Sequence, residues 1–276
     1  MRNNLSLAYQ NLGQLDRAIA AAREVLTHDP HNVHALGNLT RFLVLAGQLA
    51  EAAVMAEQMK AIPPLNVDIA VKQAEALSFL GDDVAILTIF DQLKDHDEDP
   101  GSSALLHHLA AVAALRQGKA VAARRRWQKA LKLNPSLELA VGNLADLDLP
   151  VDKRNAPWPY TIEYWLQRST AEELIREISS QRNEEAMRRA ARRFLQRHPQ
   201  IAVILPLLIE RGDPFGREFA VRVAGLAQTP ELLAALAAFA QSQVGPTQLR
   251  LQAAQFAQRG GALGNGTVRF WRGGAW

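Results

Sequence analysis

The stretch ALLHHLAAVAALRQGKAVAARRRWQKALKLNPSL, residues 104–137, decides the fold class of this chain. Small apolar residues recur at helical spacing up to Gly118, and a second helical pattern runs from there to Pro135. A glycine just after a helix satisfies the free carbonyl groups at its end, and a proline prevents the next helix from continuing. In the second helix, Ala123 is small enough to let the two backbones approach each other. The stretch is therefore one complete helix–turn–helix unit.

The same landmarks recur along the first hundred residues. Those that lie 34 residues apart are the glycines Gly13, Gly47 and Gly81, the alanines Ala18 and Ala52, and the prolines Pro30 and Pro64. Gly118 comes three residues later than this period requires, because residues 95–103 form an inserted loop by composition. The third copy departs most, with Ile86 at the alanine position and Pro100 two residues late. A fixed period of this length indicates stacked helical hairpins.

These landmarks resemble the tetratricopeptide repeat (TPR), and the resemblance covers about residues 1–147. It divides this region into four repeats and a capping helix, at residues 1–32, 33–66, 67–100, 104–137 and 138–147. The resemblance implies an all-α fold, an α-α superhelix whose first helices line a concave face. Binding in this family usually occurs on that face, so the chain is expected to be a protein–protein interaction scaffold.

Residues 148–168 interrupt the repeats and are interpreted as a linker rich in proline and aromatic residues. Its aromatic side chains are Trp158, Tyr160, Tyr164 and Trp165. They are either an exposed hot spot for a partner or a packing cluster that docks the two halves, and we favour packing.

Helical patterns resume over residues 169–261, before a Gly-rich tail at residues 262–276. Ser169 with Glu172 predicts a capping box. Further N-caps are predicted at Asn183, Asp213 and Thr229, and the last two are followed by proline. A second, weaker period of 33 residues relates Arg217, Ala220 and Ala224 to Arg250, Ala253 and Ala257. Paired helices with this pattern resemble HEAT-type repeats, which predicts a second helical-repeat-like region.

The candidate partner-binding residues are polar positions that resemble the groove-lining ones: Asn38, Arg41, Lys72, Glu75, His108 and Asn143. Amides can bind a peptide backbone, and Arg41 and Lys72 can bind carboxylates. The alternative is that these residues are only solvated. The two-carboxylate clamp of some TPR domains is not expected, because Leu7 and Asp68 stand where an asparagine and a lysine are needed.

Basic residues outnumber acidic ones by 17 to 12 in residues 148–276, where Lys153 is the only lysine. Five arginines form a stripe on the helix predicted at residues 184–198: Arg188, Arg189, Arg192, Arg193 and Arg197. This stripe is either a contact for phosphates, which gives a nucleic-acid-associated α-solenoid as the alternative function, or a solvated face part-neutralised by Glu184 and Glu185. A third possibility is the recognition arm of a larger multidomain protein.

Composition excludes several classes of chemistry. The chain has no cysteine, which rules out disulfides, Cys-ligated zinc and a cysteine nucleophile. It contains no nucleophile–base–acid constellation and no Gly-rich phosphate loop, so we expect a non-enzyme without a cofactor. The N-terminal residues lack a secretory signal, and no apolar run is long enough for a membrane span, which predicts a cytoplasmic protein without a membrane partner.

Two sequence clusters imitate metal sites. His28, His31 and His34 are three residues apart but have no carboxylate cage near them. The carboxylates Asp95, Asp97 and Asp99 imitate the start of a calcium loop, but the required glycine and bidentate glutamate are replaced by other residues. We therefore expect no metal site.

Overall fold

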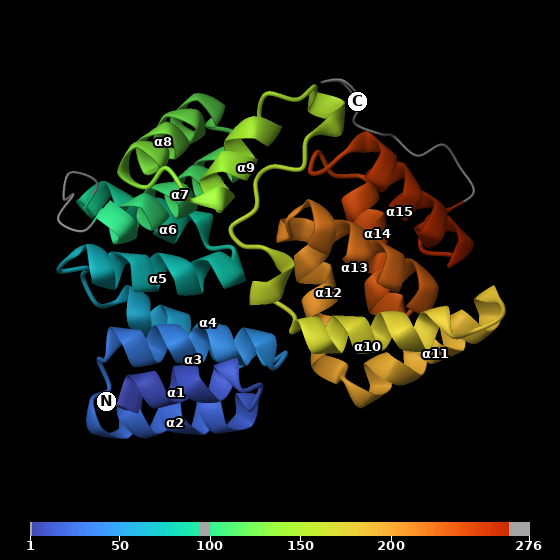
Figure 1. Cartoon of the computed structure of the whole chain (residues 1–276), viewed down its shortest axis with the longest axis horizontal. Helices are drawn as coiled ribbons and strands as arrows, with labels where there is room; N and C mark the ends of the chain where they lie inside the picture. Colours follow the sequence, from blue (N-terminus) through green and yellow to red (C-terminus); the bar gives the residue numbers. More distant parts are fainter. Residues whose placement is uncertain (1, 94–99, 265–276) are drawn as a thin grey trace. The chain divides into compact units, whose positions relative to one another are not determined.

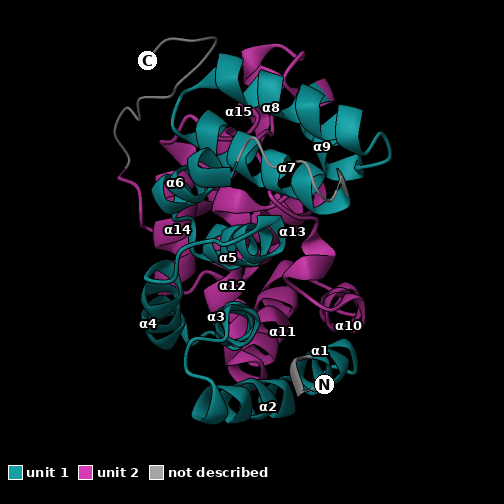
Figure 2. Cartoon of the chain, turned by 90° about the vertical axis from the view of Figure 1, so that its left-hand side faces the viewer, with its two compact units in different colours: residues 1–144 teal, residues 145–276 magenta. Residues whose placement is uncertain are grey.

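The computed structural model describes residues 2–93 and 100–264, and within these ranges every regular secondary-structure element is a helix (Figure 1). The predicted all-α fold is confirmed. Internal contacts divide the chain into two compact units, Met1–Leu144 and Ala145–Trp276, which are called unit 1 and unit 2 (Figure 2).

Unit 1 consists of four helical hairpins followed by one more helix. The helices are α1 (Arg2–Asn11) with α2 (Leu15–His28), α3 (Val33–Leu45) with α4 (Leu49–Lys60), α5 (Val67–Leu80) with α6 (Asp83–Leu93), α7 (Pro100–Arg116) with α8 (Ala120–Leu133), and α9 (Glu138–Asp146). Each first helix packs against its own second helix and against the first helix of the next hairpin. The first helices α1, α3, α5 and α7 therefore form one row (Figure 1).

The turn glycines act as the sequence predicts. All four have φ between 73° and 76°, the left-handed conformation: Gly13, Gly47, Gly81 and Gly118. At the last of these turns, Gly118 donates to the carbonyl of Leu115 and Lys119 donates to that of Ala114. The landmark alanines of the second helices are completely buried, and Ile86 is buried in the same role in the third hairpin.

Replacing Gly118 by alanine tests this conformational requirement. A Cβ atom at this position would meet no atom within 4 Å, so the only cost is backbone strain. We expect Gly118→Ala to lower the free energy of unfolding by about 1–2 kcal/mol, measured by urea unfolding followed by circular dichroism. Gly118→Asn is the matched control and should lose less, because asparagine tolerates the left-handed conformation. Equal losses in the two variants would contradict the strain explanation.

Unit 2 contains two short 3-10 helices and six α-helices among its described residues. They are η1 (Val151–Lys153), η2 (Ile162–Tyr164), α10 (Arg168–Ser179), α11 (Glu184–Arg197), α12 (Pro199–Arg211), α13 (Pro214–Ala227), α14 (Pro230–Ala240) and α15 (Thr247–Arg259). From α10 to α15, each helix packs against the next one in the chain. In addition, α13 packs against both α11 and α15, and α12 packs against α14.

Most predicted helix starts in unit 2 are correct. The side chains of Asn183, Asp213 and Thr229 accept hydrogen bonds from backbone N–H groups of the first turns of α11, α13 and α14. The capping box predicted at Ser169 is wrong. Helix α10 begins at Arg168, so Ser169 lies inside its first turn, and Glu172 accepts a bond from Arg168 at 2.8 Å instead of reaching back to a cap.

Two buried arginines occupy equivalent places in unit 2. Arg217 and Arg250 are the fourth residues of α13 and α15, and both are almost fully buried. Arg217 donates to the carbonyls of Ile209 and Glu210, in the last turn of α12. Arg250 donates to the carbonyl of Ser242, two residues after the end of α14. The 33-residue period therefore has a structural basis, while the HEAT-like classification stays a prediction.

The aromatic residues before α10 are mostly buried. Trp158, Tyr160 and Trp165 are inside, which agrees with packing rather than an exposed hot spot. Tyr164 is half-exposed and stacks on Tyr160 with ring centroids 4.9 Å apart.

Asp213, the N-cap of α13, is a buried carboxyl group. Burial raises the pKa of Asp213 above its ordinary value, and the charge of Glu163 raises it further. The N–H of Gly216 and the charge of Arg217 act in the opposite direction without cancelling this effect. A carboxyl whose pKa is raised by folding binds its proton more tightly in the folded state, so the free energy of unfolding falls as the pH rises through that pKa.

Asp213→Asn should remove this pH dependence while keeping the cap, because asparagine caps helices as well as aspartate. We expect the stability of the variant relative to the native chain to increase as the pH rises from 3.8, the ordinary value for aspartate, to neutrality. Urea unfolding at several pH values measures the difference. Asp213→Ala is the control that loses the cap, at a cost of about 1 kcal/mol. A difference between Asn and Asp that does not change with pH would contradict this account.

Candidate partner-binding surfaces

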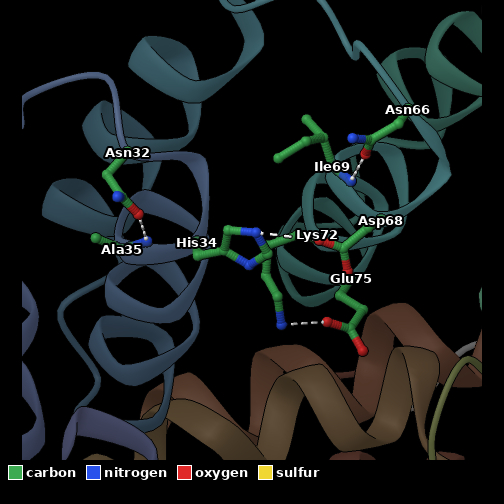
Figure 3. Close-up of polar contacts among 8 residues, drawn as sticks. All are labelled: Asn32, His34, Ala35, Asn66, Asp68, Ile69, Lys72 and Glu75. Carbon is green, nitrogen blue, oxygen red and sulfur yellow. Dashed lines mark hydrogen bonds and ion pairs between the residues drawn. The ribbon is translucent and has the colours of Figure 1, made fainter. Parts of the chain in front are cut away.

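Three of the predicted partner-binding residues are part-exposed on the row of first helices, called here the first-helix face. Lys72 and Glu75 lie one turn apart on α5, with Nζ and Oε2 2.7 Å apart and side chains 21% and 25% exposed (Figure 3). Arg41 lies on α3 and donates from Nη2 to Oε1 of Gln10 on α1 at 3.1 Å. The structure thus places one cationic side chain on each of two successive hairpins. Arg41 is bonded to Gln10, and Lys72 is bonded to Glu75.

The position of Lys72 depends on a close approach between α3 and α5. A Cβ atom on Gly37 would lie 3.0 Å from both Cγ and Cδ of Lys72. The aliphatic part of the lysine therefore lies across α3 where Gly37 has no side chain. This contact aims the ammonium group along α5 toward Glu75 rather than leaving it to rotate freely in solvent.

A second polar pair on the same face was not predicted. Nε2 of His34 on α3 is 3.2 Å from Oδ2 of Asp68 on α5, and the Asp68 side chain is 68% exposed (Figure 3). The two residues are 34 apart, and so are Asn32 and Asn66, which both cap their helices through the side-chain oxygen. The usable signal was the shared repeat position, because the period places equivalent residues of successive first helices side by side.

The other three predicted residues are buried and must be corrected. Asn38, His108 and Asn143 have almost no exposed surface, so a partner does not reach them. His108 accepts a hydrogen bond at Nδ1 from the indole N–H of Trp127 at 3.1 Å, and Asn143 donates to the carbonyl of Leu139 at 2.9 Å.

Repeat register does not explain these errors. Asn38 and Lys72 each lie nine residues before their turn glycine, yet Asn38 is buried and Lys72 is part-exposed. At the same register before Gly118, Leu109 is completely buried. The burial of His108 follows from the packing of α7 on α8, where Trp127 donates to its ring.

A double-mutant cycle tests the structural role of His108. Trp127→Phe removes the indole donor, and His108→Leu removes the imidazole acceptor. We expect a coupling energy of about 0.5–1.5 kcal/mol between the two changes, since the hydrogen bond exists only when both native residues are present. Urea unfolding of the four proteins gives the value. Strictly additive losses would mean that the bond does not contribute to stability.

The arginine stripe of α11 is largely paired. Its members have the following partners: Arg188 with Glu184 at 3.3 Å, Arg189 with Glu185 at 2.8 Å, Arg197 with Glu177, and Arg192 with the carbonyl of Ala227 at 2.6 Å. Arg193 is exposed and makes no ion pair with a described residue. The stripe therefore carries less free positive charge than the sequence suggested.

The described residues show no arrangement typical of a metal site or a membrane span. No three histidine, aspartate or glutamate side chains among them are grouped as a metal would require. The aspartates 95, 97 and 99 lie outside the described residues. Over residues 2–93 and 100–264, none of the helices has the length and apolar character needed to cross a membrane. A cytoplasmic location stays a prediction.

The stacked hairpins of unit 1 define a helical-repeat solenoid. Comparison with known families shows a match to the tetratricopeptide repeat over residues 12–77. The chain is also 33% identical over 79 residues to the TPR repeat-containing protein YvcD of Bacillus subtilis (strain 168), a match that covers 29% of this chain and 16% of YvcD. Residues 12–77 therefore match the tetratricopeptide repeat, which confirms the resemblance of the sequence over that part of unit 1. Such repeats are, as a class, scaffolds for protein–protein interactions.

Proposed function

We propose that the chain is a non-enzymatic scaffold that binds a peptide or partner protein on its first-helix face. The observation that supports this most directly is the row of charged groups across successive hairpins, formed by Arg41, Lys72, Glu75 and Asp68. Each group is held in place by a neighbouring helix or a neighbouring turn. Their orientation is therefore set before a partner arrives, which lowers the entropy lost on binding.

The alternation of charge on this face favours an extended segment with polar and acidic side chains. Arg41 provides a planar donor group suited to a carboxylate. The exposed carboxylate of Asp68 can accept hydrogen bonds from backbone N–H groups of the same segment. Lys72 and Glu75 already neutralise each other. They are therefore suited to fix where along the face a bound segment lies, rather than to attract a strongly charged ligand.

The larger context is a further part of the proposal. The match to YvcD covers 29% of this chain and only 16% of that protein, so most of each protein lies outside the matched repeats. A repeat unit of this kind also suits the recognition arm of a larger multidomain protein, in which another domain would carry the activity.

Charge reversal distinguishes the first-helix face from the arginine stripe. We expect Arg41→Glu combined with Lys72→Glu to weaken a captured protein partner about tenfold or more, since both reversals oppose an acidic segment. Arg188→Glu combined with Arg189→Glu is the matched control, with the same change in net charge on an exposed face. Affinity capture identifies the partner, and isothermal titration calorimetry measures each variant. Equal effects, or a larger effect of the control pair, would contradict the proposed site.

The alternative function, nucleic-acid binding through α11, is less favoured because most of its guanidinium groups are engaged. We expect no mobility shift of duplex or single-stranded DNA at low salt, where phosphate contacts are strongest. A shift that weakens with added salt and is lost in the Arg188→Glu, Arg189→Glu variant would favour this alternative instead.

A further inference from the structure

Unit 2 carries an open apolar groove between α10 and α13. Two adjoining cavities of about 350 Å³ and 310 Å³ share Ile175, Phe215 and Phe219 in their walls. Helices α10 and α13 both pack against α11. Residues of both helices line the cavities. The groove is separate from the first-helix face, which belongs to unit 1.

The sequence of both helices directs apolar side chains into this groove. On α10, Ala171, Ile175 and Ile178 recur at spacings of four and three residues, which places them on one side of the helix. On α13, Phe215 and Phe219 begin a similar stripe that continues to Leu226. Each helix therefore contributes one apolar ridge, and the groove lies between the ridges.

Two of these apolar side chains, Ile175 and Phe215, are exposed within the described part of unit 2, whereas Phe219 and Val223 are buried. Leu174 is the only residue of α10 that is buried, while Ile175 is 48% exposed. Phe215 is 63% exposed, although aromatic side chains of this size usually contribute to cores and interfaces. A contiguous exposed apolar surface with a polar rim is typical of an interaction site.

The length of the groove suits a short helix. Helix α10 has 12 residues, and at a rise of about 1.5 Å per residue its ridge is about 18 Å long. An apolar ridge on each of two helices, with open cavities between them, is the kind of surface that receives an amphipathic helix.

The charges around the groove give it a direction. Along the rim, Arg168 pairs with Glu172 at 2.8 Å and Arg222 pairs with Glu218, so these charges are neutralised. Glu163, at the η2 end, is exposed and makes no ion pair with any residue that the structure describes. The cavity at this end is lined by two carboxylates, Glu163 and Glu172, and by one guanidinium, Arg168, which pairs with Glu172 and also feels the charge of Glu163. The η2 end therefore has a net negative charge, which complements a positively charged side chain.

We propose that the groove between α10 and α13 binds an amphipathic helix of a partner protein, with its apolar side chains between Ile175 and Phe215 and a lysine or arginine beside Glu163. The partner is thus an amphipathic segment that is basic at one end. This second binding surface is independent of the proposed peptide site on the first-helix face.

The probe is a pair of fluorescent 14-residue synthetic helices with leucine at positions i, i+4, i+7 and i+11. One carries two lysines at one end, and the other carries two glutamates there. Fluorescence anisotropy measures their binding to the full chain. We expect the lysine peptide to bind at least fivefold more tightly than the glutamate peptide. Glu163→Lys should reverse this preference, because it changes the sign of the charge at the η2 end.

Phe215→Ala should weaken the lysine peptide at least tenfold, because the side chain is a wall of both cavities. Val84→Ala is the matched control: Val84 is the second residue of α6, as Phe215 is of α13, and is 65% exposed. Val84→Ala should leave the affinity for the lysine peptide unchanged.

Three results would overturn the proposal. The first is that the native chain binds the two peptides with equal affinity, or binds neither of them. The second is an affinity that Phe215→Ala does not change. The third is a native dimer, seen by sedimentation velocity, that Phe215→Ala converts to a monomer, because the occupant of the groove would then be a second copy of the chain.

Discussion

The architecture of unit 1 depends on one backbone constraint, the left-handed glycine that ends each first helix. Because Gly13, Gly47 and Gly81 hold this conformation at an interval of 34 residues, every hairpin starts its second helix at the same phase. Residues at the same repeat position then lie next to each other on successive first helices. The contact of His34 with Asp68 is a direct consequence. The turn therefore determines which side chains form the surface, although it lies away from that surface.

Unit 2 stabilises its helix pairs by a different interaction. Buried arginines donate to backbone carbonyls near helix ends, where the last turn leaves acceptors without a partner. Arg217 and Arg250 do so at equivalent positions, and Arg192 on α11 donates to the carbonyl of Ala227 at the end of α13. A guanidinium group has several donors in a fixed plane, so one side chain can satisfy two or three carbonyls. The arginine content of this unit is thus partly structural rather than a sign of an anionic partner.

The features that could be predicted from sequence are those fixed by neighbours along the chain. The repeat period, the turn glycines and the caps at Asn183 and Asp213 need only local geometry. The candidate site was less predictable, since equivalent repeat positions differ in burial: Lys72 is part-exposed, whereas Asn38 at the same register is buried. The pairing of Arg192 with a carbonyl 35 residues away depends on tertiary packing, which composition and spacing do not contain.

The two candidate surfaces differ in the groups that they offer to a partner: polar side chains that are already bonded on one, and apolar side chains exposed to water on the other. On the first-helix face, Lys72 is already bonded to Glu75 and Arg41 to Gln10, so a ligand must replace existing polar contacts and gains little net energy from each. Between α10 and α13, Phe215 and Ile175 face solvent, and covering them removes apolar area from water, which is favourable without geometric precision. Polar exchange of the first kind favours selectivity, and apolar burial of the second kind favours affinity. A scaffold with both surfaces can therefore set these two properties on separate units.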